Sequence, residues 1–115
     1  MSILNKLRNS LETFNYKVCY GKCFDPENDW NIIIYKRSSF RKKNKDYITQ
    51  YEVTICQENY IQEGLAEKII KKVTEDTKLK LLDNEMPFYY LRRGESKDVI
   101  ETLTLTFVWI DKCQM

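Results

Sequence analysis

Hydrophobic residues recur at every third or fourth position in two parts of the chain, a spacing typical of amphipathic helices. The first helix is predicted near the amino terminus, with Ser2 as its N-cap. Its apolar stripe consists of Ile3, Leu4, Leu7, Leu11 and Phe14. The second is predicted from Glu63 to Asp76, with its start at Asn59 or Gln62 and Gly64 in its first turn, where close packing would explain a glycine. Its stripe consists of Leu65, Ile69, Ile70 and Val73.

Other segments alternate between apolar and polar residues with the period of two that a half-buried strand requires. Tyr47–Cys56 shows this alternation, and Ile100–Ile110 shows it until it breaks at Val108 and Ile110. Asn31–Tyr35 instead contains three consecutive isoleucines. Tyr16–Tyr20 and Phe88–Leu91 are shorter segments rich in residues that favour strands. The sequence therefore predicts at least five extended segments.

Helix, strands, helix and strands follow one another along a chain of 115 residues, which is long enough for one hydrophobic core. This order predicts a single α+β domain over residues 1–115. We expect an antiparallel, or mixed, sheet of four to six strands, with the two main helices packed on one face. The strand at Tyr47–Cys56 is expected near the centre of the sheet.

The last strand changes character near its end. Its outer face carries threonines at first and then becomes apolar at Val108 and Ile110. On a solitary subunit these two side chains would form an exposed apolar edge. They are therefore candidates for a contact between subunits.

A cluster of cations lies between the predicted strands Asn31–Tyr35 and Tyr47–Cys56. It predicts a hairpin whose loop is basic and poorly packed, with an aromatic residue in its middle. Cations that repel one another at a loop tip usually meet an anionic partner or line a wet passage. The candidate interaction residues of this loop are Lys36, Arg37, Phe40, Arg41, Lys42, Lys43 and Lys45.

The rest of the composition argues against a catalytic site or a metal site. The chain has no histidine, so the commonest general base and metal ligand are missing, and the spacing of its four cysteines does not match a zinc site. Asp25, Glu27 and Asp29 alternate as in a calcium loop, but the internal glycine and terminal glutamate of such a loop are lacking. We expect no catalytic residue, no metal and no cofactor. No stretch reaches the ~20 apolar residues of a membrane span, so no membrane contact is expected either.

Three segments in order carry a resemblance to a known family. Trp30–Arg37 reads W-x-I-I-I-Y-x-R, Tyr51–Ile61 reads Y-x-V-T-I-x-x-E-N-Y-I, and Phe88–Phe107 reads F-Y-Y-L-R-R-G-E-S-x-D-V-I-E-T-L-T-L-T-F. With the helix that opens the chain, this order resembles the small tail-terminator, or tail-completion, proteins of long-tailed phages and phage-derived tail-like particles. The resemblance covers nearly the whole length and includes no catalytic signature.

The resemblance implies an α+β subunit that assembles into a six-membered ring. Such a ring caps the head-proximal end of the tail tube, ends tube polymerisation and offers a surface to the head or its connector. The implied partners are further copies of the chain, the tube protein, a sheath or connector protein, and DNA that passes through the lumen. The implied location is the tail of a virion or phage-like particle, after synthesis in the bacterial cytoplasm.

A ring requires two different patches on each subunit. We expect one at the apolar end of the last strand and the aromatic segment before it, and the other at the first helix or at the isoleucine strand. The candidate interface residues are Ile32, Ile34, Phe88, Tyr89, Tyr90, Arg92, Arg93, Val108 and Ile110.

Three alternatives remain open. A head–tail connector or neck protein would share the ring and differ in its stacking partner. A nucleic-acid-binding module would grip DNA with the basic hairpin alone, without reading sequence, and its affinity would fall steeply with salt. A small nuclease would need Asp25, Asp29 and Glu52, but no paired metal-ligand spacing supports it.

Overall fold

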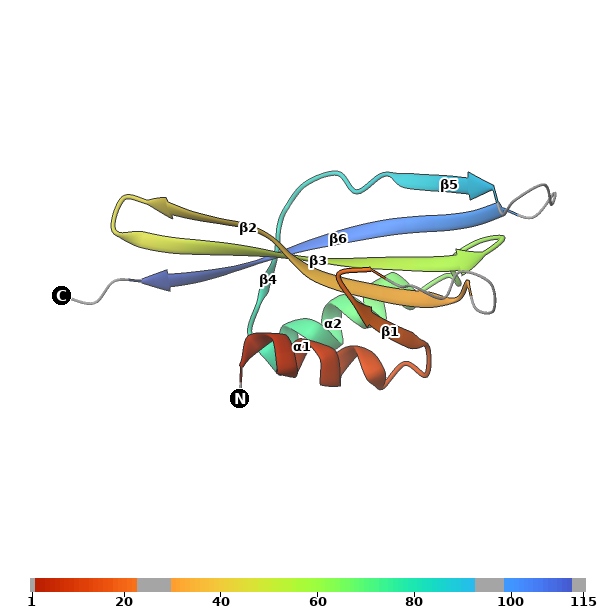
Figure 1. Ribbon diagram of the computed structural model, residues 1–115, viewed down its shortest axis with the longest axis horizontal. Coiled ribbons are helices and arrows are strands. Elements are labelled where there is room, and N and C mark those ends of the chain that lie inside the picture. The colour runs from red at the N-terminus through yellow and green to blue at the C-terminus, as the bar shows by residue number, and fades with distance from the viewer. Residues whose placement is uncertain (1, 23–29, 93–98, 113–115) are drawn as a thin grey trace.

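The computed structural model describes residues 2–22, 30–92 and 99–112. Within these ranges the protein has two helices and a mixed sheet of six strands, so the predicted α+β fold is confirmed (Figure 1). The elements are α1 (Ile3–Glu12), β1 (Lys17–Tyr20), β2 (Ile32–Lys43), β3 (Asp46–Glu58), α2 (Leu65–Thr77), β4 (Lys80–Leu81), β5 (Phe88–Arg92) and β6 (Val99–Lys112).

The sheet has the strand order β1-β2-β3-β6-β4, and β5 pairs with another part of β6. Only β1 with β2 is a parallel pair among the described strands; the other pairs are antiparallel. The strand β3 lies in the middle of this order, as its alternating pattern predicted. Both helices cover the same face of the sheet (Figure 1).

The main core fills the space between this face and the two helices. Alternate residues of β3 and β6 point into it, and each helix contributes its apolar stripe. Its fully buried side chains include Leu7, Leu11, Val53, Ile55, Ile69, Val73, Leu105 and Phe107. Burying an aliphatic or aromatic side chain of this size stabilises a fold by roughly 1.5–3 kcal/mol, so these alternating positions fix the register of the strands.

The two helices begin in different ways. At α1 the Ser2 hydroxyl oxygen accepts a hydrogen bond from the Asn5 N–H at 3.1 Å, as its predicted capping role requires. At α2 the N-cap is Gly64, with φ of +86°, so the prediction that Gly64 lies within the first turn is wrong. A Cβ there would have no heavy atom nearer than 4.0 Å, so the left-handed backbone, and not close packing, explains the glycine.

A smaller apolar cluster lies on the opposite face of the sheet. Ile32, Cys56 and Ile100 are buried there, and Trp30 and Ile34 pack against them while remaining partly exposed. Ile32 is only 8% exposed, so its side chain mainly serves the subunit's own packing. Ile34 is only half-buried, so more of its surface is exposed.

The predicted basic loop is, in the structure, a pair of long strands. β2 continues to Lys43 and β3 begins at Asp46, so only Asn44 and Lys45 form the turn, with φ of +57° at Asn44. Cross-strand pairing runs from Lys43–Asp46 back to Lys36–Glu52, with one bulge between Arg37 and Ser39. The loop prediction was wrong because charged residues disfavour strands only weakly where a neighbouring strand supplies the pairing.

These strands extend beyond the helices (Figure 1). The molecule measures 57 × 27 × 25 Å, and its radius of gyration is 15.3 Å. A compact domain of this length has a radius of gyration of about 13 Å. The extra length is a projecting end of the sheet. We call residues 36–52 of β2 and β3, together with residues 106–112 of β6, the arm; its base, at Tyr51 and Phe107, still packs in the main core.

Candidate functional site

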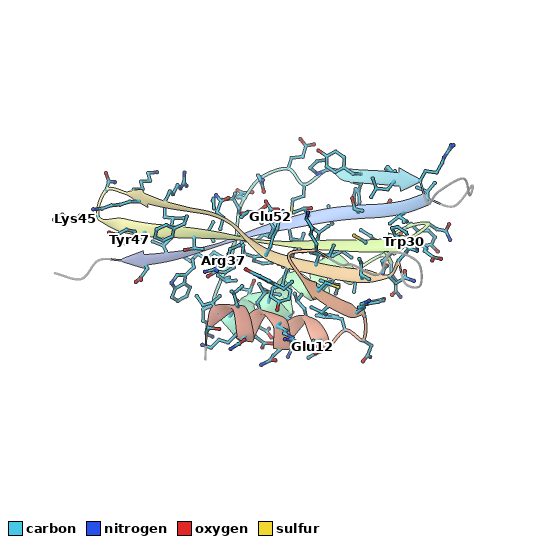
Figure 2. All side chains as sticks on the ribbon, in the orientation of Figure 1. Glu12, Trp30, Arg37, Lys45, Tyr47 and Glu52 are labelled. Carbon is cyan, nitrogen blue, oxygen red and sulfur yellow. The ribbon has the colours of Figure 1, made fainter. Side chains whose placement is uncertain are left out.

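The arm brings the predicted basic residues together on a rigid support. Because residues of a strand alternate between the two faces, the pairing with β3 divides the cations. Arg37 and Lys42 share the face that carries Phe40, whereas Lys36, Arg41 and Lys43 lie on the other. Lys45 lies in the turn, at the far end of the molecule, with Tyr47 beside it along the arm (Figure 2).

Two aromatic rings organise one face of the arm. Phe40 and Tyr47 are stacked, with 5.6 Å between ring centroids and an interplanar angle of 8°. The Lys42 ammonium lies 5.6 Å from the centroid of the Tyr47 ring, within range of a cation–π interaction. Phe40 is nevertheless 69% exposed, so the stack holds the ring in place and leaves most of its surface available for contact.

The charge of the arm is only partly balanced where it joins the body. Lys36 Nζ lies 3.8 Å from Glu52 Oε1, and both side chains are partly exposed, so this ion pair adds little stability. Burial raises the pKa of Tyr51, and the nearby positive charge of Arg37 opposes that rise. Arg41, Lys42, Lys43 and Lys45 are exposed farther out, so the positive charge is concentrated toward the tip.

The end of β6 forms the third strand of the arm. Val108 is half-buried opposite Gln50, and Ile110 is 42% exposed opposite the buried Ile48. Both have the outward, partly apolar setting that the sequence predicted. A depression of about 220 Å³ lies beside them, between this strand and the segment that includes Lys80.

The aromatic segment that was predicted as an interface forms β5. All five of its residues are exposed, and Tyr89 and Tyr90 are exposed by 63% and 60%. Phe88 and Leu91 are more than half exposed, and Arg92 ends the strand. Arg93 lies outside the described residues. The strand therefore presents exposed aromatic and apolar side chains on both faces of the sheet, with Phe88 and Tyr90 on one face and Tyr89 and Leu91 on the other.

An open groove of about 570 Å³ lies between β5 and the beginning of α2. Ile61, Ala66, Phe88 and Leu103 supply apolar surface to its lining, and Tyr60 adds an aromatic ring that is 67% exposed. The remaining described lining residues are Gln62, Glu63, Gly64, Glu67 and Glu101. Three of these carry carboxylates, and none of the described lining residues is a lysine or arginine. We call this feature the acidic groove.

Glu101 holds the inner wall of the acidic groove together. Its Oε1 accepts a hydrogen bond from the Ile61 N–H at 2.9 Å, which ties β6 to the segment before α2. The Tyr90 hydroxyl also donates to this carboxylate, and that hydrogen bond raises the pKa of Tyr90. Glu63 and Glu67 are exposed at the α2 side of the groove.

No pattern in the sequence predicted the acidic groove. Its acids occur singly, at Glu63, Glu67 and Glu101, and its apolar residues are spread along the chain from Ile61 to Leu103. Only the pairing of β5 with β6, and the packing of α2 beside them, brings these residues together. The basic cluster, in contrast, is contiguous in sequence and was found from its composition.

The described part of the chain contains neither a cluster of metal ligands nor a membrane-spanning helix. Across residues 2–22, 30–92 and 99–112, no three Cys, Asp or Glu side chains come together as a metal site would require. Asp25, Glu27 and Asp29 lie outside these ranges, and Glu52 is paired with Lys36. Neither helix in the same ranges is long and apolar enough to cross a membrane.

Models of known protein families and curated proteins give no match to this chain.

Proposed function

We propose that copies of this protein close into a six-membered ring that caps the head-proximal end of a phage or phage-like tail tube. The ring ends tube polymerisation and provides the surface to which a head or collar attaches. The observation that supports this most is the pair of exposed surfaces that a solitary subunit leaves uncovered: the aromatic strand β5 and the basic arm. They lie in opposite halves of an elongated molecule (Figure 1).

Two different surfaces in opposite halves of a subunit favour head-to-tail contact. A head-to-tail contact uses a different patch on each partner, and it generates a ring whenever the rotation between neighbours closes. A two-fold dimer can also join two different patches, but only when both contacts form at once between two antiparallel subunits. A ring needs a single contact with each neighbour, so two surfaces at opposite ends of an elongated subunit suit a ring.

The arm would then be repeated around the ring. Because its cations are set in paired strands, each copy would hold them in nearly the same position relative to the axis. A collar of positive charge can guide DNA through a lumen without reading its sequence. In a particle that carries no DNA, the same charges can dock on acidic surfaces of the tube or sheath.

Two other functions share part of this support. The stack of Phe40 on Tyr47 among cations favours a nucleic-acid-binding module, because exposed aromatic rings beside basic residues can stack on bases. That function predicts salt-sensitive binding of single-stranded DNA by the monomer. A head–tail connector would form the same ring and differ in the protein that stacks on it.

Electron microscopy of the purified protein tests the proposal. Negatively stained wild-type protein should show rings of about six subunits with a central hole, and gold-labelled protein should be found at one end of assembled tail tubes. Tails that assemble without this protein should vary widely in length. Particles that never contain the protein, and tubes of normal length in its absence, would refute the proposed function.

A further inference from the structure

We infer that the arm of one subunit docks in the acidic groove of a second copy of this chain. The inference rests on the proposed ring and identifies the contact that closes it. The arm presents Phe40 and Lys42 on one face, and the groove presents apolar surface beside the carboxylates of Glu63 and Glu67. The two surfaces are therefore complementary in charge, and each offers apolar surface to the other.

The groove suits an occupant that is both aromatic and cationic. Ile61, Phe88 and Leu103 can receive an apolar group, while the carboxylates of Glu63 and Glu67 face solvent beside it. An anionic ligand, such as a nucleic acid, would be repelled by the same carboxylates. A cation carried on an aromatic, rigid segment would be attracted by the charge and positioned by the apolar surface.

The arm supplies such a segment. Phe40 extends from a paired strand and is fixed against Tyr47, and Lys42 lies over the same ring. Groups that are already held in their bound geometry lose little conformational freedom on docking, so more of the contact energy contributes to affinity. Phe40 is 69% exposed, so the subunit's own fold leaves that ring available to a partner.

Both surfaces cannot meet within one subunit. The arm continues the central sheet away from the helices, whereas the groove lies in the other half of the molecule, beside β5 (Figures 1 and 2). The molecule is 57 Å long, and the three strands of the arm, β2, β3 and β6, are paired with one another in the central sheet, so the arm does not fold back. The arm therefore reaches only the groove of a neighbour, and each subunit both gives an arm and receives one.

Charge reversal on either surface tests this contact. One variant carries Lys42→Glu with Lys43→Glu in the arm, and the other carries Glu63→Lys with Glu67→Lys in the groove. Each variant alone should repel its own copies and run as a 13.9 kDa monomer in size-exclusion chromatography with light scattering. An equal mixture should form closed rings again, because each acidic arm meets a basic groove and each basic arm meets an acidic groove.

Controls separate this contact from general effects of charge. Lys6→Glu with Lys22→Glu makes the same change in net charge as the arm variant, at exposed positions outside the arm and the groove, and should form rings like the wild type. Far-ultraviolet circular dichroism checks the fold of each variant. If a reversed variant does not fold, the neutral pairs Lys42→Gln with Lys43→Gln and Glu63→Gln with Glu67→Gln take its place, and each should weaken assembly at least tenfold.

The outcomes distinguish the contact from the ring itself. Rings formed by both reversed variants would overturn the inference and leave the proposed ring intact. Monomeric variants that do not reassemble when mixed would also overturn it, because the arm and groove would then not be partners. Wild-type protein that stays monomeric at every concentration would refute both. Binding of single-stranded DNA that is lost in the arm variant while its rings persist would assign the arm to nucleic acid instead.

Discussion

The left-handed backbone at Gly64 determines where α2 begins. With φ of +86°, this position is strained for any residue with a Cβ, although the space around it is open. Replacing glycine by alanine at a positive φ typically destabilises a protein by about 1 kcal/mol. Gly64→Ala should therefore lower the free energy of unfolding by about that amount, measured by urea denaturation.

An asparagine at the same position provides the control. Asparagine adopts the left-handed region more readily than alanine does, so Gly64→Asn should lose less stability than Gly64→Ala. Since the position also lines the acidic groove, both variants should be measured under conditions in which the protein is monomeric. Equal stability of the wild type and both variants would show that the helix does not need this conformation.

Two buried tyrosines should make the free energy of unfolding depend on pH in alkaline solution. Burial raises the pKa of both Tyr35 and Tyr51 above the usual 10.0. The native state therefore keeps these protons at a pH where the unfolded chain has released them. The contribution of the two hydroxyls to the free energy of unfolding is fully present below about pH 10, and it is lost as the pH rises through the native pKa values. In that range each tyrosine should contribute a slope of up to about 1.4 kcal/mol per pH unit.

Phenylalanine substitutions test this origin of the slope. Tyr51→Phe removes one titrating hydroxyl and keeps the ring, so its stability should fall less steeply between pH 10 and 11 than that of the wild type. The other ionisable groups are present in both proteins, so their effect cancels in the comparison. Tyr89→Phe is the matched control because Tyr89 is 63% exposed and does not act on Tyr35 or Tyr51. Parallel slopes for wild type and Tyr51→Phe would contradict the prediction.

At the scale of secondary structure elements, periodicity predicted the elements that bury one face. The stripes of α1 and α2 and the alternation in β3 and β6 correspond to the residues of the main core, because burial itself produces those patterns. Two features had no such signal. The parallel pairing of β1 with β2 depends on a long-range contact, and the start of α2 depends on the backbone conformation of one glycine.

The arm was the main error at this scale, and its cause is physical. Its hairpin strand from Lys36 to Lys43 is exposed along its whole length, so no hydrophobic period marks it as a strand. Pairing with β3, the stack of Phe40 on Tyr47, and the extension of β6 on the other side of β3 hold it extended. The candidate interaction residues were thus identified from composition, while their spatial arrangement depended on tertiary pairing.

The end of β6 carries a prediction of its own. Ile110 is 42% exposed and lies across from Ile48, so a partner that covers it would bury an apolar side chain. Val108→Asp with Ile110→Asp should therefore give a monomer by light scattering. Because Val108 is half-buried, the pair also lowers stability, whereas Ile110→Asp alone should weaken assembly with a stability change below about 1 kcal/mol.

The control for this prediction is an equally exposed aromatic residue outside the arm. Tyr20 is 49% exposed on β1, and Tyr20→Asp introduces the same charge elsewhere on the sheet. That variant should assemble as the wild type does. An unchanged ring with Ile110→Asp would remove the end of β6 from the interface and leave the arm tip as the surface to investigate.

For the whole molecule, the distribution of charge along the long axis matters more than its total. The chain carries a net charge of only +2, yet the cations of the arm and the carboxylates of the groove lie in opposite halves. Such a molecule has little net repulsion between copies and a strong preference for one mutual orientation. This asymmetry favours ordered head-to-tail assembly over nonspecific association.

Salt dependence tests whether this asymmetry drives assembly. The screening length falls from about 10 Å at 0.1 M salt to about 3 Å at 1 M, so contacts between exposed arm cations and Glu63 or Glu67 should weaken strongly over that range. Apolar contacts, such as those expected at β5 and Ile110, keep or gain strength. Sedimentation velocity from 0.1 to 1 M sodium chloride should show rings converting to smaller species. The Lys6→Glu, Lys22→Glu control should show the same dependence on salt as the wild type. A ring population that stays constant or grows with salt would instead show that apolar contacts, such as those at β5 and Ile110, close the ring.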